Sequence, residues 1–131
     1  MRSETEGVPC VAPSLSPNAL PFFMLHFLRR APNPYEISAA DLQTRLRQGP
    51  PVHVIDCRES AELSRPGITP SEHLPLGRFP ASVETLRTRA AQADLIIVCA
   101  HGQRSLHAAR FLRNEGIANV WSLAGGLKSW R

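Results

Sequence analysis

The sequence lacks the cysteine pattern that holds many small secreted domains together. Its 131 residues contain three cysteines, Cys10, Cys57 and Cys99, which is an odd number at wide spacing. Such a set does not predict a disulfide framework, and a chain of this length has enough residues to form a hydrophobic core without one. This use of cysteine predicts a reducing, cytoplasmic environment.

Lysine is almost absent, and the basic residues do not form a cluster. Fourteen of the fifteen basic residues are arginine, and only Arg29 and Arg30 stand next to each other. This scatter does not predict nucleic-acid binding, whereas a formal net charge of +4 favours small anionic substrates. No spacing of histidine and cysteine predicts a zinc site, so we expect neither a metal nor a cofactor.

Long apolar runs are also lacking, and we expect no transmembrane span. The longest apolar segment, "LPFFMLHFLRR", is too short to cross a bilayer and has no basic region before it, as a signal peptide would. It lies in residues 1–34, which hold six of the twelve prolines. We interpret 1–34 as a flexible arm whose apolar segment is a docked helix or strand, or a membrane-surface anchor. A translation start at Met24 is another interpretation.

The remaining residues, 35–131, alternate between strand and helix patterns and are interpreted as one domain. This alternation predicts an α/β fold with a mostly parallel central sheet of about five strands and helices on both faces. Serines at 38, 82 and 105 are the expected N-caps of three helices. The expected strands are 35–38, 51–57, 72–76, 94–100 and 119–123, and the expected helices are 39–49, 59–63, 82–93, 105–116 and a short one after Gly125-Gly126.

A thiol stands at the end of the most apolar strand, in "DLIIVCAHGQRS". Ligands of parallel α/β sheets bind at the carboxyl ends of strands, which is where Cys99 lies. If the loop curls around the thiol, its backbone N–H groups and the following helix dipole would stabilise a thiolate and lower its pKa. Gly102 suits a loop that needs positive φ or a close backbone approach, and Arg104 offers an anionic substrate a planar donor fork.

Other cysteine and histidine side chains give weaker signals. His101 is either a rim residue that contacts substrate or a general base beside the nucleophile, although the loop alone favours the thiolate. Cys57, within "VIDCRES", is interpreted as a buried structural cysteine, and Cys10 as incidental. Three other histidines are expected to pack against the domain or to face solvent: His53, His73 and His107.

Several segments between residues 37 and 130 resemble the rhodanese family of sulfurtransferases. They are "ISAADLQTRL", "VIDCRES", "HLPLG", "CAHGQRS" and "AARFLRNEGIANVWSLAGGLKSW", of which the last, with its Gly-Gly-x-x-x-Trp ending, is the most specific. One segment departs from the family. Where the family carries Gly-His-Ile-Pro-Gly-Ala, "RPGITPSEHLPLG" has Gly67 and Ile68 but neither the histidine nor the second glycine. We expect a reshaped loop there, at the rim of the site.

The resemblance implies the chemistry of the site. Cys99 would be the nucleophile that takes sulfane sulfur from thiosulfate or a persulfide donor and passes it to cyanide, a thiol or an acceptor protein. Asp56 and Arg58 would support the base of the loop. The substrate- and persulfide-binding loop would comprise Ala100, His101, Gly102, Gln103, Arg104 and Ser105.

Two other functions compete with this interpretation. One is a non-catalytic rhodanese-like module for binding or regulation, although such modules usually lack the cysteine. The other is a cysteine phosphatase or arsenate reductase, whose loops place the arginine one residue farther from the cysteine. The spacing here, Cys99-x4-Arg104-Ser105, is shorter, and a tetrahedral oxyanion needs a wider loop than one sulfur atom.

Overall fold

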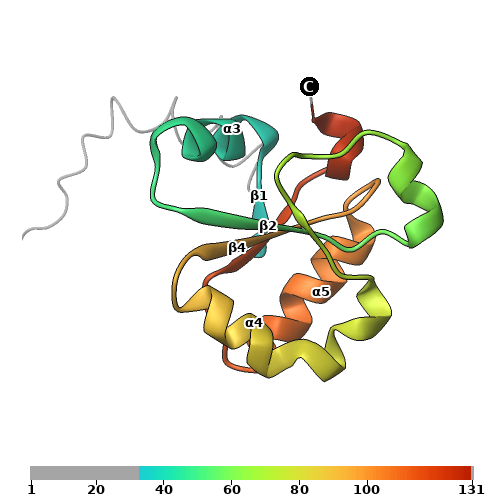
Figure 1. Ribbon diagram of the computed structural model, residues 1–131. Coiled ribbons are helices and arrows are strands. Elements are labelled where there is room, and N and C mark those ends of the chain that lie inside the picture. The colour runs from blue at the N-terminus through green and yellow to red at the C-terminus, as the bar shows by residue number, and fades with distance from the viewer. Residues whose placement is uncertain (1–32, 131) are drawn as a thin grey trace, which may run out of the picture. The chain divides into compact units, whose positions relative to one another are not determined.

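The structure, a computed structural model, describes residues 33–130 (Figure 1). Apart from Asn33, these residues belong to a compact unit that comprises Pro34–Arg131. The interpretations of Cys10, of Met24 and of the apolar segment in the arm fall outside the described residues. They therefore stay predictions.

A five-stranded parallel sheet forms the centre of the fold, as predicted. Its strand order is β1-β5-β4-β2-β3, and every neighbouring pair is parallel. The central strand β4 therefore has a partner on each side. The strands are β1 (Glu36–Ile37), β2 (Val52–Asp56), β3 (Glu72–His73), β4 (Asp94–Val98) and β5 (Val120–Leu123).

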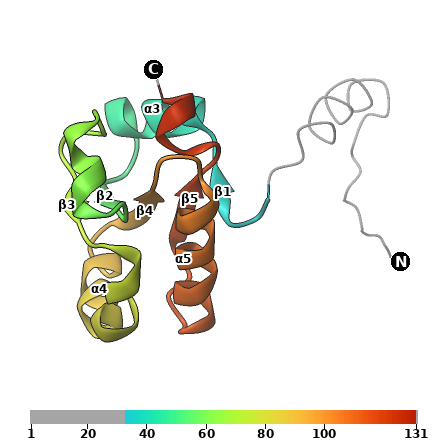
Figure 2. The same ribbon diagram turned by 90° about the vertical axis from the view of Figure 1, so that its right-hand side faces the viewer.

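Helices cover both faces of this sheet, because β4 is apolar on both sides. Its residues alternate between two buried clusters, with Leu95 and Ile97 in one and Ile96 and Val98 in the other. Figure 2 shows α4 and α5 on one side of the sheet, and α3 with the last helical turn, η5, on the other. These elements are α3 (Ala39–Gln48), α4 (Val83–Ala90), α5 (Gln103–Asn114) and η5 (Gly126–Ser129).

Only one of the three expected serine caps makes a capping hydrogen bond. The Ser38 hydroxyl accepts a hydrogen bond from the Asp41 N–H at 3.0 Å and caps α3. Ser82 stands at the N-cap position of α4, as predicted, but its hydroxyl donates to the Arg78 carbonyl at 2.8 Å and makes no capping hydrogen bond to α4. The prediction for Ser105 was wrong, because α5 begins two residues earlier, after Gly102, and places Ser105 in its first turn.

The segments between β2 and α4 contain short 3-10 helices. The helical turn expected at 59–63 is η2 (Ser60–Ser64), and the extended segment expected at 72–76 pairs with β2 only through β3. Two further turns, η3 (Leu76–Arg78) and η4 (Pro80–Ser82), lead into α4. Within the part of the chain that the structure describes, every helix is too short or too polar to cross a membrane.

Candidate active site

The site is centred on Cys99, which follows β4 at the carboxyl end of the central strand. Its side chain is only 1% exposed. The chain then turns through Gly102, whose φ of +97° lies in the left-handed region that favours glycine. Helix α5 starts at Gln103, so its N-terminus faces the sulfur directly.

Two backbone N–H groups and one hydroxyl group lie against the Cys99 sulfur. The N–H groups of Gly102 and Ser105 donate to Sγ, with N···S distances of 3.1 and 3.3 Å. The Ser105 hydroxyl lies 3.4 Å from Sγ and 2.7 Å from the hydroxyl of Ser122, which is fully buried on β5. Because the following helix also places its positive dipole end here, the loop favours a negatively charged sulfur.

A second cysteine strengthens this preference. The Cys57 side chain is the largest cause of the lowered pKa of Cys99, ahead of the Ser105 and Gly102 hydrogen bonds. Together these groups outweigh burial, which raises the pKa, and the pKa of Cys99 lies well below that of an ordinary thiol. The neighbouring Cys99, followed by burial, raises the pKa of Cys57. At neutral pH, Cys99 is therefore the thiolate and Cys57 the thiol.

The segment Gly125-Gly126 and the turn η5 that follows it pack against the cysteine loop on the side away from the Cys99 sulfur. The N–H groups of Leu127 and Lys128 donate to the carbonyl oxygens of Cys99 and Ala100 at 2.8 and 3.0 Å. A side chain at Gly126 would clash, because its Cβ would lie 2.5 Å from the Gly102 nitrogen. This close packing turns the loop carbonyls outward, and the loop N–H groups are left to face the sulfur.

Arg104 does not stand free at the mouth of the site. Its Nη1 and Nη2 atoms bind the two carboxylate oxygens of Glu62 at 2.7 and 2.8 Å. The Arg104 hydrogen bond lowers the pKa of Glu62 to about 2, and the same bond raises the pKa of Arg104. An anionic substrate therefore meets a guanidinium group whose charge is already balanced. No pattern in the sequence indicates that Glu62 is the partner of Arg104.

Asp56 and Arg58 form a buried ion pair at the end of β2. Arg58 Nη2 lies 2.8 Å from Asp56 Oδ2, and both side chains are 4% exposed. Arg58 Nη1 also donates to the carbonyl oxygens of Glu62 and Arg65, each at 3.2 Å. The pair thus fixes η2 and the residues that follow it, and it is connected to the cysteine loop through Glu62 and Arg104.

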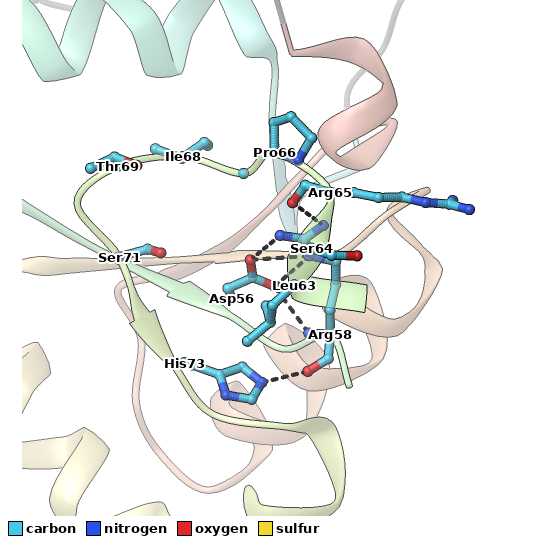
Figure 3. Close-up of a pocket in the computed structure, with 11 residues that line it drawn as sticks. Asp56, Arg58, Leu63, Ser64, Arg65, Pro66, Ile68, Thr69, Ser71 and His73 are labelled. Atoms are coloured by element: carbon cyan, nitrogen blue, oxygen red, sulfur yellow. Dashed lines mark hydrogen bonds and ion pairs between the residues drawn. The ribbon is translucent and has the colours of Figure 1, made fainter. Parts of the chain in front are cut away.

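A pocket of about 390 Å³ opens beside this ion pair (Figure 3). One wall is the loop that departs from the rhodanese pattern, which runs past Gly67 and Ile68 to Ser71. His73 closes the other end, and its Nε2–H donates to the Arg58 carbonyl at 2.7 Å. Cys99 does not line this pocket, so the loop lies beside the cysteine site, at the end of the neighbouring strand β2.

The remaining residues of the predicted loop have separate positions. His101 and Gln103 are exposed, Ala100 is half-buried, and Gly102 and Ser105 are buried. His101 thus lies on the solvent side of the loop. Within residues 33–130, no three histidine, cysteine or acidic side chains gather closely enough to hold a metal ion.

Sequence reasoning missed Cys57, Glu62 and Ser122. Cys57 had a usable signal, since it follows a β-branched strand just as Cys99 does, and parallel strands bring their carboxyl ends together. Glu62 and Ser122 had none, because their partners lie 42 and 17 residues away in the chain.

A family model and the curated relatives place the chain in one family. The family described as "Rhodanese-like domain" matches residues 38–131. The "Putative sulfurtransferase YtwF" of Bacillus subtilis is 28% identical over 95 residues, which are 72% of this chain and 88% of that protein. The "Thiosulfate sulfurtransferase GlpE" of Pseudomonas fluorescens is 33% identical over 78 residues, which are 60% of this chain and 69% of that protein. A solved rhodanese-related protein from Thermoplasma volcanium is 32% identical with a TM-score of 0.62, over 72% of this chain and 88% of that one.

Proposed function

The chain belongs to the family of rhodanese-like domains, and from this premise we propose that it transfers sulfane sulfur through a persulfide on Cys99. The observation that carries the proposal is the Cys99 sulfur itself, which accepts hydrogen bonds from the Gly102 and Ser105 N–H groups. A thiolate attacks sulfur, and a thiol does not. The loop therefore keeps the nucleophile in its reactive form.

In the first half-reaction, the Cys99 thiolate attacks the outer sulfur of thiosulfate. A bond forms between Sγ and that sulfur, the sulfur–sulfur bond of thiosulfate breaks, and sulfite leaves with the electron pair. The negative charge then lies on the outer sulfur of the persulfide. Backbone N–H groups in the first turn of α5, which have no partner within the helix, are in position to stabilise it.

In the second half-reaction, an acceptor nucleophile attacks the outer sulfur, and Cys99 leaves as the thiolate. Cyanide would give thiocyanate, a small thiol would give its persulfide, and an acceptor protein would carry the sulfur onward. The hydrogen bonds that lower the pKa of Cys99 also make it a good leaving group. We place this activity in the cytoplasm, where a resting thiol pair stays reduced. Thiosulfate as donor is supported by the relative that carries this substrate in its name.

Thiosulfate:cyanide sulfur transfer by the full chain tests the proposal, with Cys99→Ser as the variant. We expect no turnover by Cys99→Ser, together with an unfolding temperature close to that of the wild type, because the change is nearly isosteric. The intact mass after thiosulfate treatment should increase by one sulfur atom in the wild type and stay unchanged in Cys99→Ser. Cys10→Ser is the matched control and should retain both signals. Turnover by Cys99→Ser would require another nucleophile and overturn the proposal.

A further inference from the structure

Cys57 and Cys99 end neighbouring strands in the same register. Strands β2 and β4 are parallel, and Asp56 lies opposite Val98. The next residues along the two strands are Cys57 and Cys99, and the Cys57 N–H donates to the Val98 carbonyl at 2.9 Å. Neighbouring strands are about 4.8 Å apart, which lies within the Cα separation of about 4.4–6.8 Å that disulfides require.

The two side chains also lie on the same face of the sheet. Both belong to the buried cluster beneath α4 and α5, with exposures of 0% for Cys57 and 1% for Cys99. Neither cysteine forms a disulfide in this structure, and each has the largest influence on the pKa of the other. Because Cys57 has no access to solvent, the sulfur atom it can react with is that of Cys99.

We propose that Cys57 is a resolving thiol, which converts the Cys99 persulfide into a Cys57–Cys99 disulfide and releases hydrosulfide. This inference rests on the proposed function, because the persulfide is its substrate. It adds a second activity to the site, the reduction of sulfane sulfur, when no acceptor takes the sulfur away.

The step balances without any further oxidant. The Cys57 sulfur attacks Sγ of Cys99, one sulfur–sulfur bond forms, and the bond between Sγ and the outer sulfur breaks. The outer sulfur gains two electrons and leaves as hydrosulfide, taking up the proton that Cys57 gives up. Each cysteine sulfur is oxidised by one electron. A small thiol or dithiol reductant then reduces the disulfide by thiol–disulfide exchange and restores the resting pair.

The same contacts explain why the resting pair does not react. With Cys99 as a thiolate, the neighbouring negative charge keeps the proton on Cys57. In the persulfide this charge moves one bond outward, toward the N–H groups of the loop, and Sγ becomes an electrophile. Formation of the persulfide therefore both creates the target of Cys57 and removes the charge that held its proton.

Persulfide lifetime in the absence of an acceptor tests this inference. The full chain is treated with thiosulfate, freed of excess donor, and sampled over time for intact mass, alkylatable thiols and released hydrosulfide. In the wild type, we expect the added sulfur to disappear while hydrosulfide is released and Cys57 and Cys99 both lose their reactive thiols. The decay should be first order and independent of protein concentration, because both cysteines belong to one chain.

The test variants are Cys57→Val and Cys57→Ser. Two different replacements are used so that a packing defect caused by one of them is not mistaken for the loss of the thiol. Both should keep the persulfide after the wild type has lost it, with no release of hydrosulfide. Cys10→Ala, the matched control, should decay as the wild type does. Peptide mapping should find the disulfide between Cys57 and Cys99.

Two results separate the failure of this inference from that of the proposed function. If the persulfide forms on Cys99 and lasts equally long with and without Cys57, or if sulfur maps to Cys57 itself, the resolving role is wrong and sulfur transfer stands. If no folded variant that retains Cys99 forms a persulfide, the proposed function is wrong and the resolving role falls with it.

Discussion

Four polar groups influence the charge on the sulfur of Cys99. The N–H groups of Gly102 and Ser105 donate hydrogen bonds to Sγ, the Ser105 hydroxyl lies 3.4 Å from it, and the Cys57 thiol also lowers its pKa. No basic side chain contacts the sulfur among the hydrogen bonds of the described residues. The thiolate is therefore stabilised by neutral dipoles held in fixed positions, and the stabilisation resists screening by salt.

Replacing Ser105 with alanine should raise the pKa of Cys99. A hydrogen bond to a charged group contributes about 1.5–3 kcal/mol, and one pKa unit corresponds to about 1.4 kcal/mol, so we expect a rise of about one to two units. The rate of alkylation by iodoacetamide, followed against pH, would measure it. The variant would need a higher pH for the same fraction of thiolate.

The exposed Ser60, which makes no side-chain hydrogen bond in the described residues, provides the control for that experiment. Ser60→Ala should leave the alkylation profile unchanged. An unshifted profile for Ser105→Ala would show that its hydroxyl does not stabilise the thiolate.

The ion pair between Glu62 and Arg104 should determine whether the enzyme prefers charged or neutral sulfur donors. Glu62→Gln removes the carboxylate that balances the guanidinium charge, so we expect the KM for thiosulfate to fall by about fivefold and that for a neutral trisulfide to change little. Steady-state kinetics with both donors measure the difference.

Glu84 lies exposed on α4, where it forms an ion pair with Arg87, and Glu84→Gln makes the same change of net charge. It should affect neither donor. Arg104→Ala should raise the KM for thiosulfate more than that for the neutral donor. Equal changes for both donors in either Glu62 or Arg104 variants would show that this pair does not act through charge.

At the scale of elements, η5 supports the cysteine loop. The N–H groups of Leu127 and Lys128 donate to the carbonyl oxygens of Cys99 and Ala100. The glycines at 102, 125 and 126 let the backbone of the cysteine loop and that of η5 approach closely. The Gly-Gly segment is thus part of the site, although its side of the loop carries no reactive group.

Gly126→Ala should damage the site more than the fold. Its Cβ would lie 2.5 Å from the Gly102 nitrogen and 2.6 Å from the Cys99 carbonyl oxygen, and its φ of +66° suits glycine alone. Overpacking of this kind costs about 1–3 kcal/mol of the free energy of unfolding. Because the loop must shift, we expect sulfur transfer to drop by more than about tenfold.

Denaturant unfolding and the thiosulfate assay would measure the two effects on the same protein. Gly77→Ala is the matched control, since a Cβ there has no neighbouring atom within 4 Å. Full transfer activity in Gly126→Ala would contradict a supporting role for this contact.

Sequence patterns predicted the elements of this site better than its contacts. The apolar run before Cys99 identified a strand buried on both faces, and Ser38 was placed correctly as a cap. Ser105 was misplaced, because a serine before an apolar helix suits both a cap and a first-turn position. Its partner on β5 is visible only once the strand order is known. The ion pair of Glu62 and the effect of Cys57 on Cys99 depend on that order as well.

At the scale of the whole molecule, the strand order brings the site together. Because β4 lies between β2 and β5, the carboxyl end of β4 is next to Cys57 on one side and Ser122 on the other. Within residues 33–130, the members of the two buried clusters and of the site lie between Tyr35 and Trp130. The site thus draws on segments from most of the described chain.

Deletion of residues 1–34 should leave sulfur transfer unchanged unless "LPFFMLHFLRR" is docked on the domain, because Cys99 and the groups that contact its sulfur lie outside this segment. Thermal unfolding and the thiosulfate assay, each compared with the full chain, measure this. A large drop in the unfolding temperature would show that the segment is docked on the domain.

The contact between η5 and the cysteine loop also has a consequence during protein synthesis. Cys99 leaves the ribosome before Ser122, Leu127 and Lys128, which complete the hydrogen bonds around it and behind it. Until those residues emerge and fold, the hydrogen bonds that they make to Ser105 and to the loop carbonyls are absent. We therefore expect Cys99 to reach its low pKa only after β5 and η5 have been synthesised.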